Sequence, residues 1–144
     1  MSSKKFSFSY HSFLATWSLV SNKFKNEECP SKLISHPTRD DISKYQKLNA
    51  TIVGISVDSL FALGKFREEQ KLPFDLLSDF NKDVATKYDS LYEQFPKFGL
   101  KGVTKRSAFV IDKQGVVKYA EVLADASKVP DFDKIKEVLE NCGQ

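Results

Sequence analysis

The chain has 144 residues, which suits one domain with a single hydrophobic core. Hydrophobic residues make up 41% and charged residues 28%, as in an ordinary soluble globular protein, and no apolar run approaches the ~18 residues that a membrane span requires. The 22 basic and 19 acidic residues are interspersed and leave a net charge of +3, so we expect neither a nucleic-acid nor a membrane partner.

Cys29 and Cys142 are the only cysteines. Two cysteines in a chain of this length do not make a disulfide scaffold. The histidines, His11 and His36, lie at no spacing that is typical of a zinc site, so we expect no metal. Residues 1–20 contain no small-x-small cleavage site, which indicates a cytoplasmic protein rather than a secreted one.

The first third of the chain has a weak pattern. Aromatic residues and serines alternate over 6–10, which predicts a strand. We expect a helix over 13–24 and a loop over 27–37. Thr38 is then a suitable N-cap for a helix over 39–48, and one face of that helix carries Ile42, Tyr45 and Leu48.

From residue 51 onward the pattern is clear. The nearly all-apolar, β-branched run over 51–57 predicts a strand buried on both faces, as in a parallel sheet. Asp58 or Ser59 can cap a following helix that ends at Gln70, because Pro73 disfavours helical geometry in the residue before it. One side of this helix carries Leu60, Leu63 and Phe66.

Three further elements follow in chain order. Residues 74–77 predict a short strand and residues 82–88 a helical segment. Residues 107–111 predict a third strand, joined by a tight turn at 112–115 to a returning strand over 116–122. Gly115 supplies the positive φ of that turn, so the last two strands are expected to be antiparallel.

A last helix is predicted from Pro130 to Asn141. Proline suits a first helical turn, and Asp131 and Asp133 suit the positive end of the helix dipole. Strands separated by helices predict a sheet with helices packed on it. The buried stripe of the last helix consists of Phe132, Ile135, Val138 and Leu139.

Three segments carry a family resemblance. They are Val-Gly-Ile-Ser-Val-Asp-Ser at 53–59, Leu-Pro-Phe with Leu-Ser-Asp within 72–79, and Lys-Arg-Ser-Ala-Phe-Val-Ile-Asp at 105–112. In this order and spacing they resemble consecutive blocks of a peroxiredoxin, in particular of the bacterioferritin-comigratory and one-cysteine-like group. The resemblance implies an α/β thioredoxin-like fold with a central mixed sheet, a terminal β-hairpin and a last helix. It implies one such domain over 1–144, in which 1–37 is an atypical segment.

The resemblance also implies an activity. Peroxiredoxins are thiol-dependent peroxidases that reduce hydrogen peroxide or alkyl hydroperoxides through a cysteine thiolate, without a metal or organic cofactor. The implied partners are a hydroperoxide substrate, a thioredoxin-like or small-thiol reductant, and a second copy of the chain. Phe95 and Pro96 mark a candidate dimer face. Arg106 matches the family's pocket arginine, whose charge favours the thiolate.

The attacking cysteine of this family lies in a Pro-x-x-x-Thr-x-x-Cys motif, which no stretch of this chain contains. Three partial registers stay open. Cys29, followed by Pro-Ser-x-Leu, resembles the run that starts at the attacking cysteine. Alternatively, residues 10–18 follow the strand-and-loop pattern and put a serine at the cysteine position. In the third register, residues 34–37 end the first core strand and the cysteine loop is missing.

Each cysteine therefore has a candidate role. Cys29 is the only upstream candidate for the nucleophile, although Glu27 and Glu28 precede it and neighbouring carboxylates raise the pKa of a thiol. Cys142, near the chain end, is a possible resolving thiol. The alternative function is a non-catalytic peroxiredoxin-like domain that lacks the cysteine motif and acts as a binding or dimerisation module.

Overall fold

The computed structural model describes residues 12–17 and 142 by their backbone, and residues 45, 47–48, 50–95, 98–112 and 114–141 in full. The strand predicted over 6–10 and the loop predicted over 27–37 lie outside these ranges. Of the helix predicted over 39–48, Tyr45, Lys47 and Leu48 are described; the first two are helical and Leu48 lies in a turn.

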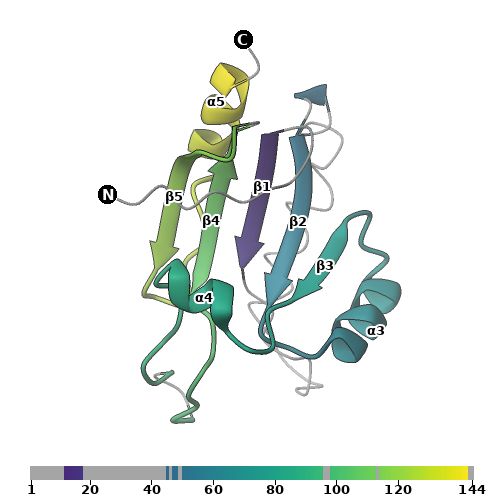
Figure 1. Ribbon diagram of the computed structural model, residues 1–144, viewed down its shortest axis with the longest axis vertical. Coiled ribbons are helices and arrows are strands. Elements are labelled where there is room, and N and C mark those ends of the chain that lie inside the picture. Colours follow the sequence, from purple (N-terminus) through teal and green to yellow (C-terminus); the bar gives the residue numbers. More distant parts are fainter. Residues whose placement is uncertain are drawn as a thin grey trace.

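A mixed five-stranded sheet forms the centre of the molecule, in the order β3-β2-β1-β4-β5 (Figure 1). Three neighbouring strands, β1, β2 and β3, are parallel, whereas β4 runs antiparallel to β1, and β5 antiparallel to β4. This arrangement confirms the parallel strand and the terminal antiparallel pair that the sequence predicts. The strands are β1 Ser12–Trp17, β2 Ala50–Ser56, β3 Asp75–Ser78, β4 Arg106–Ile111 and β5 Val117–Leu123.

Strand β1 overturns the predicted helix over 13–24 in the part that the structure describes, residues 13–17. Residues 12–17 form six consecutive pairs with β2 and a further five with β4. A short apolar run has no periodicity that distinguishes a buried strand from a buried helix. Hydrogen bonding to a neighbour on each side therefore decides the backbone conformation here, and β1 is the central strand of the sheet (Figure 1).

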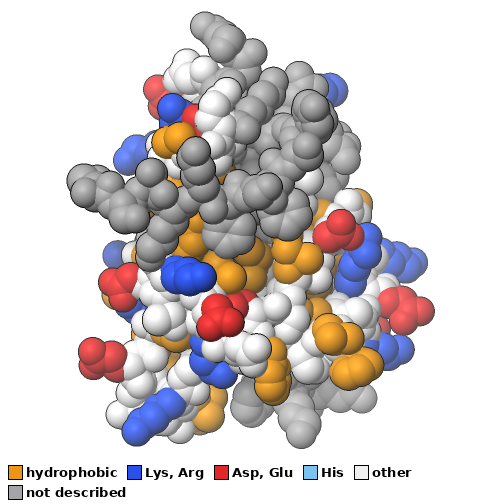
Figure 2. Space-filling view, viewed as in Figure 1, with side chains coloured by type: hydrophobic (Ala, Val, Ile, Leu, Met, Phe, Trp, Pro, Cys, Tyr) orange, Lys and Arg blue, Asp and Glu red, His pale blue; other side chains and the backbone are white. Residues whose placement is uncertain are grey.

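The helix α3, Leu60–Gln70, begins at the predicted cap, since the Ser59 hydroxyl accepts a hydrogen bond from the Ala62 amide at 3.3 Å. Its predicted apolar side is only partly buried. Leu63 is buried and Phe66 half-buried, but Leu60 is 65% exposed. Hydrophobic side chains accordingly reach the surface over α3 in Figure 2. The helix packs beside β3, an edge strand of four residues, which is too short to cover the whole helix.

The core has two layers because successive residues of a strand point to opposite faces of the sheet. Ala108 and Val110 of β4 pack on one face with Tyr45 and with the last helix, α5 Phe132–Cys142. Phe109 points to the other face, against the short helix α4 Asp83–Lys87. The predicted stripe of α5 is confirmed, with Ile135 and Leu139 fully buried and Phe132 and Val138 packed beside them.

The predicted turn between β4 and β5 is also confirmed. Gly115 has a φ of +79°, and the Asp112 carboxylate accepts hydrogen bonds from the amides of Gln114 and Val116 at 2.9 and 2.8 Å. Partial burial raises the pKa of Asp112, but these amides and Lys118 outweigh it and lower that pKa below its ordinary value. The carboxylate is thus the ionised acceptor that closes the turn.

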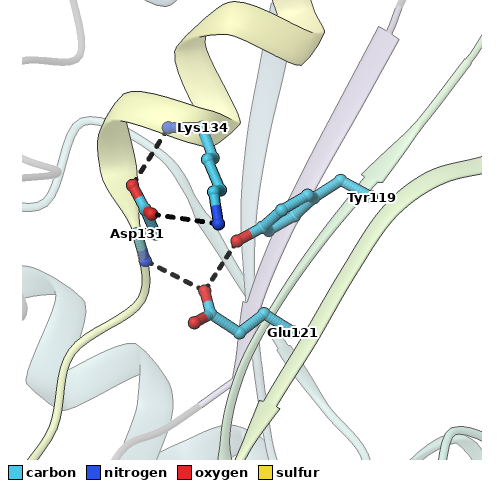
Figure 3. Close-up of polar contacts among 4 residues, drawn as sticks. All are labelled: Tyr119, Glu121, Asp131 and Lys134. Atoms are coloured by element: carbon cyan, nitrogen blue, oxygen red, sulfur yellow. Dashed lines mark hydrogen bonds and ion pairs between the residues drawn. The ribbon is translucent and has the colours of Figure 1, made fainter.

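Glu121 fastens α5 to the sheet. Its carboxylate accepts hydrogen bonds from the Tyr119 hydroxyl at 2.8 Å and from the Asp131 amide at 2.9 Å (Figure 3). The Asp131 carboxylate in turn accepts from the Lys134 amide, as a helix cap does. Burial and the Glu121 charge raise the pKa of Tyr119, so its hydroxyl stays a donor at neutral pH. One carboxylate therefore joins β5 to the start of α5.

We expect Glu121→Ala to lower the free energy of unfolding by about 1–3 kcal/mol, because it removes two hydrogen bonds from part-buried donors. The measurement is urea denaturation followed by circular dichroism. Glu137→Ala, an exposed change within α5, is the control and should stay within about 0.5 kcal/mol of the parent. Equal effects of the two changes would show that the Glu121 contacts contribute no stability.

Candidate active site

The candidate site lies at the edge of the sheet where the parallel strands end. The arrowheads of β1, β2 and β3 point to this edge, and β4 begins there (Figure 1). Trp17, the last residue of β1, pairs with Ile55 near the end of β2 and with Ser107 of β4. Arg106, the residue before Ser107, therefore lies beside the point at which the chain leaves β1. Ligands of open α/β sheets commonly bind at this edge.

Arg106 is the buried cation at this edge. Arg106 is 6% exposed, and an arginine is almost never buried in a protein unless its guanidinium has partners. One guanidinium nitrogen, Nη1, donates a hydrogen bond to the Lys128 carbonyl oxygen at 3.2 Å. A carbonyl acceptor fixes the direction of the guanidinium without adding a negative charge. This contact therefore orients Arg106 and leaves its positive charge in place.

The segment after β5 supplies that carbonyl. Asp125 accepts hydrogen bonds from the amide and the hydroxyl of Ser127 at 2.9 and 2.6 Å, and the Lys128 amide donates to the Asp125 carbonyl at 3.2 Å. The Ser127 hydrogen bonds lower the pKa of Asp125, and the charges of Lys128 and Arg106 add to that effect. The turn from Asp125 to Lys128 is thus held by its own hydrogen bonds.

Tyr92 lies beside the same segment and was not a predicted site residue. Its hydroxyl donates a hydrogen bond to the Ala124 carbonyl at 2.8 Å, and its ring meets Phe95 edge to face at 5.4 Å. Burial raises the pKa of Tyr92, the charge of Arg106 opposes this rise, and the charge of Asp125 adds to it.

The predicted site residues differ in how far the structure describes them. Arg106 lies at the carboxyl edge of the parallel strands. Cys29 lies outside the described residues, as does His36. The backbone of Cys142 ends α5, but its side chain is not among those described.

Two of the three registers for the attacking residue are wrong. The second assigns residues 10–18 to the end of a strand and a loop, but residues 12–17 are all strand. The third ends the first core strand at 34–37, but β1 occupies the place between β2 and β4. The first register, which starts at Cys29, stays a prediction. In that register the cysteine follows β1 and precedes the helical residue Tyr45.

A cavity of about 320 Å³ lies at the opposite end of the sheet, around the start of β2. Arg67 and Asp75 form an ion pair of 3.1 Å in its wall. Arg106 is not part of this cavity. Among the described residues no three metal-ligating side chains come together, and no helix there is long and apolar enough to cross a membrane.

The sheet and its helices match solved structures with a thioredoxin fold. The chain is similar to a PrxQ cysteine-to-serine mutant of Xylella fastidiosa, with a TM-score of 0.74 and 19% identity over 94% of this chain and 80% of that one. It is likewise similar to the bacterioferritin comigratory protein of Xanthomonas campestris, with a TM-score of 0.74 and 20% identity over 94% of this chain and 82% of that one. The fold class that the sequence predicts is thereby confirmed.

The sequence comparison identifies the family. The profile of the AhpC/TSA family matches residues 17–120, well over half of the chain, and the chain therefore belongs to this family, the peroxiredoxins. It is 34% identical to peroxiredoxin Bcp of Bacillus subtilis (strain 168) over 103 residues, which cover 71% of this chain and 62% of Bcp. The chain thus spans less than two thirds of the length of this curated relative.

We expect Arg106→Ala to loosen the segment after β5, because the Lys128 carbonyl loses its donor. The amides of Ser127 and Lys128 should exchange with deuterium about three- to ten-fold faster, the factor that corresponds to one hydrogen bond. Lys105→Ala, a change at the neighbouring position, is the control and should leave these rates as they are. Unchanged exchange in Arg106→Ala would mean that the contact does not hold the segment.

Proposed function

We propose that the protein is a thiol-dependent peroxidase that reduces hydrogen peroxide or alkyl hydroperoxides through the thiolate of Cys29. The observation that carries the proposal is the buried guanidinium of Arg106 at the end of β1, in a chain of the peroxiredoxin family. The relative from Xanthomonas campestris is described as reducing alkyl peroxides, which supports this substrate class.

The topology supports a meeting of Cys29 with Arg106. Parallel neighbours β1 and β2 require a crossover connection, and Cys29 belongs to the residues that make it. The connection starts at Trp17, beside Arg106, and it ends past Tyr45, which packs on the same sheet face as Ala108. Arg106 is two residues before Ala108 in β4, so its side chain belongs to that face as well.

The proposed reaction requires an ionised thiol. A guanidinium within about 4–6 Å lowers the pKa of a thiol and opposes the effect of Glu27 and Glu28. The thiolate of Cys29 attacks one peroxide oxygen, the O–O bond breaks, and the leaving oxygen takes up a proton to give water or an alcohol. The sulfur is oxidised to a sulfenic acid while the peroxide is reduced. Arg106 stabilises the negative charge that develops on the leaving oxygen.

A second thiol completes the proposed cycle. It condenses with the sulfenic acid, forming a disulfide and releasing water, and an external thioredoxin-like or small-molecule dithiol reduces that disulfide. Cys142 is the candidate resolving thiol within the chain. No metal or organic cofactor takes part. We further propose a cytoplasmic homodimer with Phe95 and Pro96 at its face, and one domain over 1–144.

The alternative is a non-catalytic peroxiredoxin-like module that binds a partner or dimerises. The sequence supports it at one point, because the family's Pro-x-x-x-Thr-x-x-Cys motif is absent and two glutamates precede Cys29. The buried position of Arg106 at the carboxyl edge of the parallel strands favours the peroxidase. For this reason we place the peroxidase first.

Peroxide consumption by the reduced protein with excess dithiol tests the proposal. We expect turnover by the wild type and none above the dithiol background by Cys29→Ser, because that change removes the attacking thiolate. Cys142→Ser should still perform the first oxidation and should slow the cycle if Cys142 resolves it. A wild type that consumes peroxide no faster than the dithiol alone would leave the binding module as the function.

The role of Arg106 predicts a graded effect on the rate constant for peroxide. Arg106→Ala should lower it about ten- to a hundred-fold, the equivalent of one charged hydrogen bond. Arg106→Lys should fall between this variant and the wild type, because lysine keeps the charge but lacks the planar guanidinium. Lys118→Ala, a change of an exposed basic residue on β5, is the control. Equal rates for wild type and Arg106→Ala would remove Arg106 from the site.

A further inference from the structure

We propose that Tyr92 is the positioning residue of Arg106, acting through the segment 124–128. The inference rests on the proposed function, since it concerns the orientation of the arginine of the proposed peroxide site. We assign Tyr92 no direct role in the reaction. Its place in the structure is defined by three contacts, each to a different part of the chain around Arg106.

The backbone of Tyr92 is fixed to the residues just before Arg106. Its amide donates a hydrogen bond to the Val103 carbonyl at 2.9 Å. The preceding residue, Leu91, forms an antiparallel bridge with Thr104, and the Lys105 amide donates to the Ser90 carbonyl at 2.6 Å. Two short antiparallel segments therefore hold Tyr92 at a constant place relative to the start of β4.

The side chain of Tyr92 reaches the other side of the site. Its hydroxyl donates to the Ala124 carbonyl at 2.8 Å, across 32 positions of the sequence. Ala124 directly follows the end of β5, whose Leu123 pairs with Arg106. The ring lies edge to face with Phe95, which restricts the direction in which the hydroxyl points. The contact therefore fixes the first residue of the segment 124–128.

The segment transmits this restraint to Lys128. Asp125 and Ser127 are joined by two hydrogen bonds, and the Lys128 amide is joined to the Asp125 carbonyl. A turn with these internal bonds moves as a unit, so a fixed Ala124 implies a fixed Lys128 carbonyl. That carbonyl accepts from Arg106 Nη1 at 3.2 Å. The contacts thus form a closed ring from Arg106 through Lys128, Ala124 and Tyr92 back to β4.

The contacts at the two ends of this segment are made to backbone carbonyls, since the Tyr92 hydroxyl donates to Ala124 and Arg106 donates to Lys128. The Asp125 carboxylate lies between them and accepts the two hydrogen bonds from Ser127 that hold the turn. The Tyr92 hydroxyl therefore orients the cation indirectly, through the backbone of the segment 124–128.

Tyr92→Phe tests the inference, because it keeps the ring and the contact with Phe95 while removing the hydroxyl. The matched control is Tyr119→Phe, which also removes a hydroxyl that donates at 2.8 Å but lies on β5 beside α5 (Figure 3). Both variants are studied as the full chain, below the unfolding transition of either. This pairing separates a general loss of stability from an effect on Arg106.

The first readout is nuclear magnetic resonance of the Arg106 guanidinium nitrogens. We expect faster rotation about the Nε–Cζ bond in Tyr92→Phe, by about three- to ten-fold, and the wild-type rate in Tyr119→Phe. The same rotation rate in Tyr92→Phe as in the wild type would overturn the inference. This readout requires no activity, so it decides the role of Tyr92 even if the wild type consumes no peroxide and the proposed function fails.

The second readout applies to an active wild type. The rate constant for peroxide should fall about three- to ten-fold in Tyr92→Phe, with the rate of the later reduction by dithiol unchanged. Tyr119→Phe should stay within about two-fold of the wild type at every step. A wild-type rate constant for peroxide in Tyr92→Phe would show that the hydroxyl does not position Arg106 for the reaction.

Discussion

The pairing of β1 with a neighbour on each side is the constraint on which the rest of the described structure depends. Parallel pairing with β2 requires a crossover connection, and antiparallel pairing with β4 brings Arg106 to the point where that connection begins. If β1 were absent from the sheet, β2 and β4 would lose their common neighbour and the buried guanidinium would lie at an exposed sheet edge. The central strand therefore defines both the core and the location of the candidate site.

The described site contains a buried cation, and one of its hydrogen bonds goes to a backbone carbonyl. Burial of a charge is costly unless hydrogen bonds replace its hydration, and the Lys128 carbonyl supplies one of them. Hydrogen bonds from Ser127 lower the pKa of Asp125, and the charge of Arg106 adds to that effect. Such an arrangement suits a group that must attract an anion that forms only during a reaction.

A second network of hydrogen bonds joins two elements of the fold. Glu121 joins β5 to α5 through a tyrosine hydroxyl and a helix-terminal amide (Figure 3). The acceptor there is a carboxylate, and the amides of a helix start favour negative charge. The Glu121 network holds two elements of the fold together, whereas the closed ring at Arg106 lies at the candidate site.

Local sequence patterns determined the elements from residue 50 to the end. The β-branched run of β2, the Ser59 cap of α3, the glycine turn after β4 and the stripe of α5 depend on neighbours within a few residues, so the sequence predicted each of them. The three family blocks lie in the same part of the chain. They predicted the fold, which is confirmed, and a site role for Arg106, which stays a prediction.

Only the tertiary structure decided the conformation of β1 and the surroundings of Arg106. Residues 12–17 form a strand because two distant strands supply its hydrogen bonds, a partnership that no local periodicity contains. The bond from Tyr92 to Ala124 and the bond from Arg106 to Lys128 end on backbone carbonyls. Every residue has such a carbonyl, so the sequence alone carries no signal for these contacts, and the folded chain selects them.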